Sequence, residues 1–166
     1  MTKVLVVREL RTEDWPSVRA IYEEGIRSGD ATFETEAPSW DAWDAAHPDL
    51  RLVSVRDGEV VGWAALSPFS SRCCYRGVGE VSVYISEEAR GRGVGRALLE
   101  RLVDRSEQRG YWTLTAGIFP ENEASLRLHG ACGFREVGVH ERLGESNGVW
   151  RDVVWLERRS EAVGGV

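Results

Sequence analysis

The sequence predicts a single α/β (α+β) domain in which helices flank a central, mixed and mostly antiparallel sheet. A length of 166 residues fits one domain, and such a chain can bury a core without disulfides or metals. Segments with strand-like alternation are interspersed with segments of helical spacing, and several strands follow one another directly. This order departs from the regular strand–helix alternation of a doubly wound sheet.

The first half of the chain predicts three strands and two helices. They are Lys3–Arg8, a helix from Asp14 to about Gly29, a short helix from Ser39, and the strands Leu52–Val55 and Val60–Leu66. Asp14 is expected to be the N-cap of the first helix, because its carboxylate suits an unpaired N–H and a proline follows in the first turn. Asp57-Gly58 is typical of a tight hairpin turn between the two strands.

The second half predicts four strands and two helices. They are Glu80–Ile85, the helix Val94–Arg109, Trp112–Ile118, the helix Asn122–Cys132, Arg135–Glu141 and Val149–Glu157. Alternation along the first of these strands places Glu80, Ser82 and Tyr84 on one face. We expect one domain over residues 1–159 and a frayed C-terminal tail over 160–166.

Composition and charge exclude several classes of function. A net charge of −6 argues against nucleic-acid binding, which needs a positive field. No apolar run approaches the ~18 residues that span a membrane, and the N-terminal apolar stretch is too short for a signal peptide. Cys73, Cys74 and Cys132 are odd in number and lack metal-ligand spacing. We therefore expect a cytoplasmic, reduced protein with neither a metal nor a membrane partner.

A glycine-rich turn between a strand and a helix is the most informative segment. It holds, in order, Arg90, Gly91, Arg92, Gly93, Val94, Gly95 and Arg96. Unpaired N–H groups at a helix N-terminus, with the positive end of the helix dipole, suit a diphosphate, and glycines allow its oxygens to approach the backbone. The spacing matches neither the dinucleotide fingerprint nor the P-loop. The alternative is a glycine-rich turn whose arginines are merely solvated.

The segment Arg90-Gly-Arg-Gly93-Val-Gly95 resembles the Q/R-x-x-G-x-G/A signature of the GNAT acetyltransferases. Further blocks resemble the phosphinothricin and methionine sulfoximine acetyltransferase subgroup in the same order along residues 4–157. They are the strand from Glu80 to Ser86, the block from Asn122 to Phe134, the stretch from Ala31 to Glu36, and Trp150-Arg-Asp152-Val. The resemblance implies a GNAT-type domain over residues 1–159 that binds acetyl-CoA.

The resemblance also implies which residues contact acetyl-CoA. The proposed cofactor-binding residues are Val83, Tyr84, Ile85, Arg90, Gly91, Arg92, Gly93, Val94, Gly95, Arg96, Asn122 and Ser125. The backbone of Val83–Ile85 would pair with the pantetheine arm like an added strand, and a backbone N–H there would bond the thioester oxygen. Asn122 has an equally good explanation as the N-cap of the next helix.

Two residues are candidates for acid–base catalysis. Glu80 matches the family's glutamate at the start of this strand, and a carboxylate there can take a proton from the acceptor ammonium directly or through water. The alternative is a solvated glutamate at a strand end. His129 stands near the position where many relatives carry a tyrosine general acid, and histidine titrates near pH 7. It can equally be a buried histidine on a helix face.

The acceptor pocket is expected to include residues from three segments. The candidates are Phe33, Arg72, Tyr75, Arg76 and Ser82. Arg72 or Arg76 would form charge-assisted bonds to a substrate carboxylate, unless both are ordinary surface arginines. Some phosphinothricin enzymes carry a histidine in the C-terminal loop where this chain has Asn147, which leaves phosphinothricin specificity open.

The sequence thus favours an enzyme that moves an acetyl group from acetyl-CoA to the amino group of a small amino-acid-like substrate by direct attack. Phosphinothricin, methionine sulfoximine or a related L-amino acid is the expected acceptor. A protein N-terminal acetyltransferase and a non-catalytic acyl-CoA sensor are the alternatives. A dinucleotide-binding module is disfavoured by the strand order and by the absence of the acidic residue after a second strand. The resemblance further implies a homodimer with sites near the interface.

Overall fold

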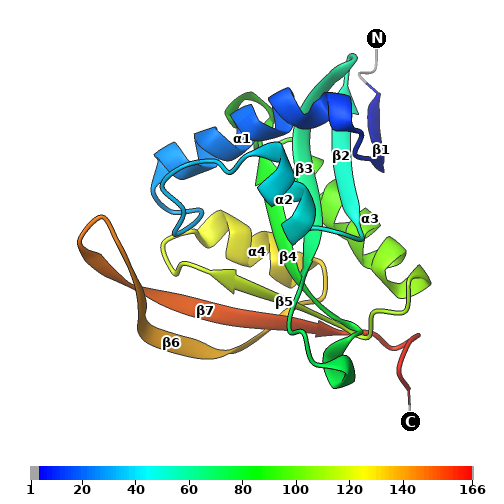
Figure 1. The fold of residues 1–166 in the computed structure, drawn as a ribbon, viewed down its shortest axis with the longest axis vertical. Helices are drawn as coiled ribbons and strands as arrows, with labels where there is room; N and C mark the ends of the chain where they lie inside the picture. The colour runs from blue at the N-terminus through cyan, green and yellow to red at the C-terminus, as the bar shows by residue number, and fades with distance from the viewer. Residues whose placement is uncertain (1–3, 166) are drawn as a thin grey trace.

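Residues 4–165, which the computed structural model describes, form one seven-stranded sheet with helices on both faces (Figure 1). The strands are β1 (Leu5–Glu9), β2 (Arg51–Arg56), β3 (Glu59–Pro68), β4 (Val78–Ile85), β5 (Thr113–Ile118), β6 (Arg135–Ser146) and β7 (Val149–Arg159). Their order across the sheet is β1-β2-β3-β4-β5-β7-β6. Every neighbouring pair is antiparallel except β4 and β5, which confirms the predicted mixed, mostly antiparallel sheet.

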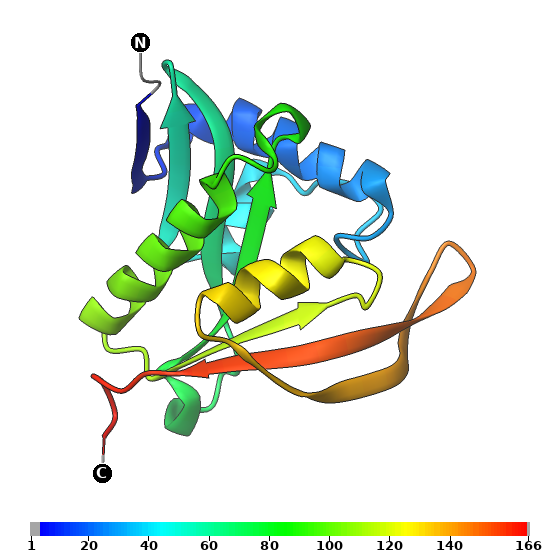
Figure 2. The same ribbon diagram turned by 180° about the vertical axis from the view of Figure 1, so that it is seen from behind.

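The helices divide between the two faces of the sheet. They are α1 (Trp15–Ser28), α2 (Trp40–Ala46), α3 (Val94–Gln108) and α4 (Glu123–Ala131), with short 3₁₀ turns at Thr12–Asp14, Cys73–Tyr75 and Glu87–Ala89. Helices α1 and α2 cover the face that Figure 1 turns to the viewer, and α3 and α4 cover the face seen from behind in Figure 2. The hairpin of β6 and β7 projects beyond the helices in both views.

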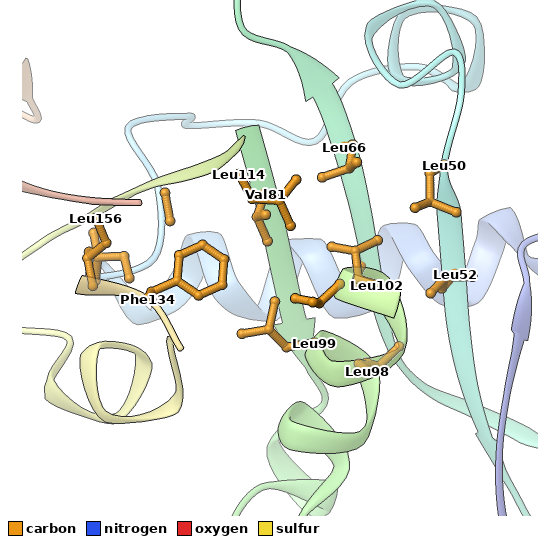
Figure 3. Packing of buried hydrophobic residues seen from close by; sticks show 14 of the residues in the cluster. Leu50, Leu52, Leu66, Val81, Leu98, Leu99, Leu102, Leu114, Phe134 and Leu156 are labelled. Carbon is orange, nitrogen blue, oxygen red and sulfur yellow. The ribbon is translucent and has the colours of Figure 1, made fainter. Parts of the chain in front are cut away.

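Each face of the sheet has its own hydrophobic core. On the α3 side, Leu98, Leu99 and Leu102 are fully buried against sheet residues that include Leu66 and Val81 (Figure 3). Truncating one of these leucines to alanine should cost about 2–5 kcal/mol of stability. On the other side, an aromatic cluster joins the helices to the sheet; its members include Tyr22, Trp43, Trp63 and Tyr84. The two cores hold β4 rigidly from both faces.

The helix ends lie close to their predicted positions, and the predicted caps form with one exception. Ser39 caps α2, since its side chain accepts a hydrogen bond from the Ala42 N–H, and Gly29 ends α1 with a φ of 81°. Asp14 precedes α1 as expected but makes no capping bond to that helix. Asp14 is the last residue of the 3₁₀ turn Thr12–Asp14, and its carboxylate instead accepts bonds from the Arg8 guanidinium and the Arg11 N–H. The bond from Arg8 lowers the pKa of Asp14.

Several boundaries differ from the predicted ones. Strand β4 begins at Val78, two residues before Glu80, and β6 continues to Ser146, because the hairpin of β6 and β7 is longer than the sequence pattern indicated. Asn147 and Gly148 form the turn of this hairpin with φ angles of 51° and 77°. Lys3, expected in the first strand, lies outside the described residues.

The residues after β7 form hydrogen bonds, which differs from the frayed tail that the sequence predicts. Ser160 is buried, and its hydroxyl donates to Glu107 and accepts from the N–H groups of Ala162 and Val163. Arg159 donates to the carbonyls of Val163 and Gly164. Residues 160–165 therefore follow a hydrogen-bonded path along the end of the sheet.

Two features commonly tied to function are missing from residues 4–165. None of the helices there is long and apolar enough to cross a membrane. No group of three or more His, Cys, Asp or Glu side chains in that range is placed to hold a metal ion.

Candidate active site

Strands β4 and β5 separate after only three paired positions. Val78, Gly79 and Glu80 pair in parallel with Thr113, Leu114 and Thr115, and no later residue of β4 pairs with β5 in the described chain. On its other side β4 stays paired with β3 as far as Ile85. The edge of β4 that faces β5 is therefore left without a strand partner beyond Glu80. An open edge of this kind offers backbone donors and acceptors to an extended ligand.

Two cavities lie along this open edge. The first, called here the acceptor cavity, has a volume of about 380 Å³ and is lined by residues that include Phe33, Glu80, Ser82 and His129. The second, called the cofactor cavity, has a volume of about 650 Å³ and is lined by the glycine-rich turn and the start of α4. Six residues line both cavities: Asp30, Ala31, Val83, Tyr84, Asn122 and Ser125. The two cavities thus meet at the free edge of β4.

The glycines of the turn serve two different purposes. Gly91 and Gly93 have φ angles of 71° and 79°, and a Cβ built on either would meet nothing within 4 Å. Their positive φ and the open space above them suit a turn that an anion approaches closely. Gly95 differs, because a Cβ there would lie 3.0 Å from Leu128 Cδ2. Its small size lets α3 and α4 pack together, in addition to lining the cofactor cavity.

The arginines of the turn do not all face the cofactor cavity. Arg90 and Arg96 line it, whereas Arg92 does not. Arg90 Nε donates to the Ile85 carbonyl at 3.3 Å, and Arg96 pairs with Glu100 one turn further along α3. Arg127 of α4 adds a positive charge from the opposite wall, which the sequence pattern did not indicate. The cofactor cavity therefore combines a helix N-terminus with several cations.

Glu80 lies at the point where β4 and β5 part and lines the acceptor cavity. It is partly buried, and no donor among residues 4–165 forms a hydrogen bond with its carboxylate. Burial raises the pKa of Glu80 above the ordinary value. A carboxylate in such surroundings is a stronger proton acceptor than one in water, as a general base requires.

His129 lies on α4, lines the acceptor cavity and is 4% exposed. Its Nδ1 is 2.8 Å from the Ser125 carbonyl oxygen, so this nitrogen carries a proton and donates it. The ring packs edge-on against Phe134. Burial lowers the pKa of His129, which favours the neutral ring with a proton-accepting Nε2. The resting histidine thus suits proton acceptance, and it must first be protonated to act as an acid.

Ser82, Tyr84 and Phe33 also lie in the cavity walls. Ser82 and Phe33 line the acceptor cavity, and Phe33 meets Phe119 edge to face with ring centroids 4.8 Å apart. The Tyr84 ring packs against Trp63 and occupies the space beside Gly25, where a Cβ would approach it to 2.7 Å. Burial raises the pKa of the Tyr84 phenol, which stays protonated. The Tyr84 hydroxyl donates to the carbonyl of Ala31, another residue of the shared wall, at 3.5 Å.

Asn122 fills its predicted capping position and makes a second contact. Its Oδ1 accepts from the Ser125 N–H at 3.2 Å, and its Nδ2 donates to the Asp30 carbonyl at 3.2 Å. The side chain thereby ties the start of α4 to the loop after α1. Contact between Asn122 and a cofactor remains a prediction.

The structure does not bring Arg72, Tyr75 and Arg76 to either cavity. All three are exposed on the loop before β4; the Arg72 guanidinium lies 5.6 Å from the centre of the Tyr75 ring, and Arg76 lies over Trp112. Within one copy of the chain, the predicted contact of these three residues with the acceptor is therefore not formed.

Sequence reasoning missed much of the cavity walls. Asp30 and Glu34 contribute two carboxylates, and Phe119 and Leu143 contribute apolar wall. Nothing in the sequence pattern marks Asp30, whose role depends on the loop after α1. Leu143 follows Arg142, which has a φ of 48° where the register of β6 shifts. Such a bulge re-aims side chains and carries no clear sequence signal.

Comparison with known proteins gives consistent matches. The model of the acetyltransferase (GNAT) family matches residues 6–134. A phosphinothricin N-acetyltransferase from Alcaligenes faecalis is 40% identical over 162 residues, covering 92% of this chain and 81% of the relative.

Two solved structures match the fold closely. The crystal structure of a phosphinothricin acetyltransferase from Sinorhizobium meliloti in complex with acetyl-CoA superposes with a TM-score of 0.86 at 32% identity, covering 100% of this chain and 96% of that one. A structure described as a ribosomal-protein-alanine N-acetyltransferase from Brucella melitensis gives a TM-score of 0.87 at 31% identity, covering 93% and 99%.

Proposed function

The chain belongs to the GNAT acetyltransferase family, and we propose that it moves the acetyl group of acetyl-CoA directly to the amino group of a small amino-acid-like acceptor. Phosphinothricin, methionine sulfoximine or a related L-amino acid is the proposed acceptor class. The observation that carries this proposal is the meeting of two cavities at the free edge of β4, with Glu80 lining the acceptor cavity at the start of that edge.

The residues of the cofactor cavity fit acetyl-CoA. The N-terminus of α3 opens on Gly93, whose surroundings leave room for an anion, and Arg90, Arg96 and Arg127 supply positive charge. The unpaired edge of β4 from Val83 to Ile85 offers an extended ligand the backbone groups that a neighbouring strand would otherwise use. When bound, acetyl-CoA supplies the acetyl thioester that the amine attacks.

The acceptor cavity fits a small ammonium compound. Its described lining includes the carboxylates of Glu34 and Glu80, as well as that of Asp30, which is paired with Arg151, and it includes neither Arg nor Lys. Negative charge attracts the acceptor ammonium, and Glu80 then takes a proton from it to free the nucleophilic lone pair. His129 Nε2 is the second proposed proton-accepting atom in this cavity. Orientation of two bound reactants at the junction supplies much of the remaining rate enhancement.

We also propose a homodimer. The hairpin of β6 and β7 projects beyond the helices (Figure 2), and its strands carry exposed apolar residues, among them Val137, Val139 and Trp150. β6 is also one of the two edge strands of the sheet. A second copy that covers this face would bury the apolar residues. Arg72, Tyr75 and Arg76 remain proposed acceptor contacts only if such an assembly brings them to a cavity of the other copy.

A cytoplasmic location is part of the proposal. Cys73 and Cys74 are free and exposed. Exposed thiols persist in reducing compartments, which is where acetyl-CoA chemistry of this kind would place the protein.

Acetylation of a protein N-terminus is the second candidate, because the Brucella melitensis structure carries that description. A peptide needs an open groove, whereas residues 30–34, Phe119 and Leu143 wall the acceptor cavity of this chain. The cavity volume of about 380 Å³ suits a small molecule better than an extended peptide.

A thiol-release assay with acetyl-CoA tests the proposal. Phosphinothricin, methionine sulfoximine, the common L-amino acids and a peptide with N-terminal alanine serve as acceptors. We expect turnover with at least one free amino acid or analogue and much less with the peptide. Faster release with the peptide would support the second candidate, and no release with any acceptor would favour a non-catalytic acyl-CoA sensor.

A further inference from the structure

Arg151 of β7 contacts two loops that are distant from it, and from each other, in sequence. Its Nη1 donates to the Gly29 carbonyl at 2.8 Å, and its Nη2 donates to Asp30 Oδ1 at 2.9 Å and to Glu121 Oε2 at 3.2 Å. The guanidinium carbon lies 4.1 Å from the centre of the Phe119 ring. The Arg151 side chain is only 14% exposed. One planar cation thus bonds the loop after α1 and the loop before α4 at once.

Both loops form walls of the candidate active site. Asp30 lines the acceptor and cofactor cavities, Phe119 lines the first, and Glu121 lines the second. Asn122 adds a direct bond between the loops through the Asp30 carbonyl. Arg151 itself lines neither cavity, so any effect it has on binding must act through these neighbours.

The chemistry of Arg151 suits a fixed geometry. A guanidinium presents several N–H groups in a rigid fork, and hydrogen bonds between ionised groups are stronger than neutral ones. The Arg151 side chain is 14% exposed, whereas Asp30 and Glu121 are 50% and 57% exposed, so the geometry of the fork and its three simultaneous bonds matter more here than the strength of either ion pair. Residues 29–30 otherwise belong to a loop, where the backbone is least constrained.

We propose that Arg151 is a positioning residue that holds the shared wall of the two cavities in its binding geometry before either ligand arrives. The inference rests on the proposed function for the identity of the two ligands. With the wall already in place, the cofactor and the acceptor bind without either having to order it. Without Arg151, the first ligand must order the wall, and the second then binds to a wall that is ready.

Loss of a positioning residue changes ligand binding in a way that simple destabilisation does not. If only about a tenth of the molecules of an Arg151→Gln variant hold the wall in place, the Kd of each ligand alone rises about tenfold. Saturation with one ligand restores the affinity of the other toward the wild-type value. Positive coupling between the two ligands therefore increases when Arg151 is lost, while both separate affinities fall.

Calorimetry with coenzyme A and phosphinothricin tests the proposal, because coenzyme A lacks the acetyl group and no turnover occurs. The Kd of coenzyme A is measured alone and with saturating phosphinothricin, for the wild-type chain and for Arg151→Gln. Arg158→Gln is the matched control, since Arg158 lies on the same strand and pairs with Glu107 of α3, away from both cavities. Arg151→Lys keeps the positive charge but loses the forked geometry of the guanidinium. This variant replaces Arg151→Gln in the experiment if the glutamine variant does not fold.

We expect the ratio of the two Kd values to rise about tenfold in Arg151→Gln, less in Arg151→Lys, and not in Arg158→Gln. A folded Arg151→Gln or Arg151→Lys variant with wild-type affinity for coenzyme A would overturn the proposal. An equal loss in Arg158→Gln would overturn it as well. If wild-type protein binds coenzyme A but no amino acid, the proposed acceptor class fails, and the Kd of coenzyme A alone decides the role of Arg151.

Discussion

Glu80 lies opposite Thr115 at the last paired position between β4 and β5. From this position onward the two strands separate, and the free edge of β4 leads past Glu80 toward the glycine-rich turn. The Glu80 carboxylate therefore lies at one end of the open edge of β4, and the glycine-rich turn lies at the other. Splaying of one parallel strand pair places the proposed proton acceptor and the proposed cofactor arm along the same strand.

Gly93→Val should abolish binding of coenzyme A while the fold survives. A β-branched residue is strained at the φ of 79°, and its side chain would occupy the open space where an anion approaches. Gly110→Val is the matched control, because Gly110 has a φ of 87°, equally open surroundings and no place in either cavity. Calorimetry should show loss of binding in the first variant alone. Equal affinity in both folded variants would remove Gly93 from the cofactor site.

Glu80→Gln should be more stable than the wild-type protein at pH 7. Burial raises the folded-state pKa of Glu80 above the ordinary value of 4.5, so ionisation opposes folding. The favourable contribution of the neutral acid is complete below pH 4.5 and is lost as the pH rises through the raised pKa. Glutamine removes this pH dependence. Denaturant unfolding should show a stability gain at pH 7 that vanishes toward pH 4.5, and a gain independent of pH would contradict this cause.

His129→Gln should lower kcat by about 10²-fold or more if Nε2 takes part in proton transfer. The affinity for coenzyme A should change little, because His129 lines only the acceptor cavity. The His129 ring is buried against Phe134, so its replacement is expected to lower stability. The assays should therefore be run at a temperature where circular dichroism shows the variant to be folded. A variant with reduced stability but unaltered kcat would leave His129 as a packing residue.

Val139→Glu should convert the proposed homodimer to a monomer. Val139 is 54% exposed on β6, and a charge there would oppose burial against a second copy. Val6→Glu is the control, because Val6 is 49% exposed on β1 at the opposite edge of the sheet. Sedimentation velocity should show a dimer for the wild-type protein and for Val6→Glu only. A wild-type monomer at micromolar concentration would exclude the proposed assembly.

The sequence pattern predicted the fold well because local signals agreed with tertiary packing. Val94, Leu98, Leu102 and Val103 have helical spacing, and all four are buried in α3. The hairpin of β6 and β7 was underestimated, since its outer residues have no core to pack against and so show little apolar periodicity.

Fewer features of the candidate site than of the fold could be predicted from the sequence. Glu80, Ser82 and the glycine-rich turn lie on regular elements or at their ends. In such elements the spacing of residues along the chain determines the direction in which each side chain points. Asp30, Phe119 and Arg151 meet only through the tertiary fold, over sequence separations of up to 121 residues. The placement of Arg72 and Arg76 near the acceptor assumed that closeness in sequence to Glu80 means closeness in space.

The steady-state pH profile of Glu80→Gln tests the central claim most directly. Glutamine keeps the shape of the side chain and removes its basicity, so affinity for acetyl-CoA should persist while kcat falls by about 10²- to 10⁴-fold near neutral pH. The loss should shrink at high pH, where the free amine of the acceptor is abundant. Glu59→Gln, at the exposed start of β3, should match the wild-type enzyme throughout. A Glu80→Gln enzyme with the wild-type rate and the wild-type pH profile would show that another group or bulk water removes the proton.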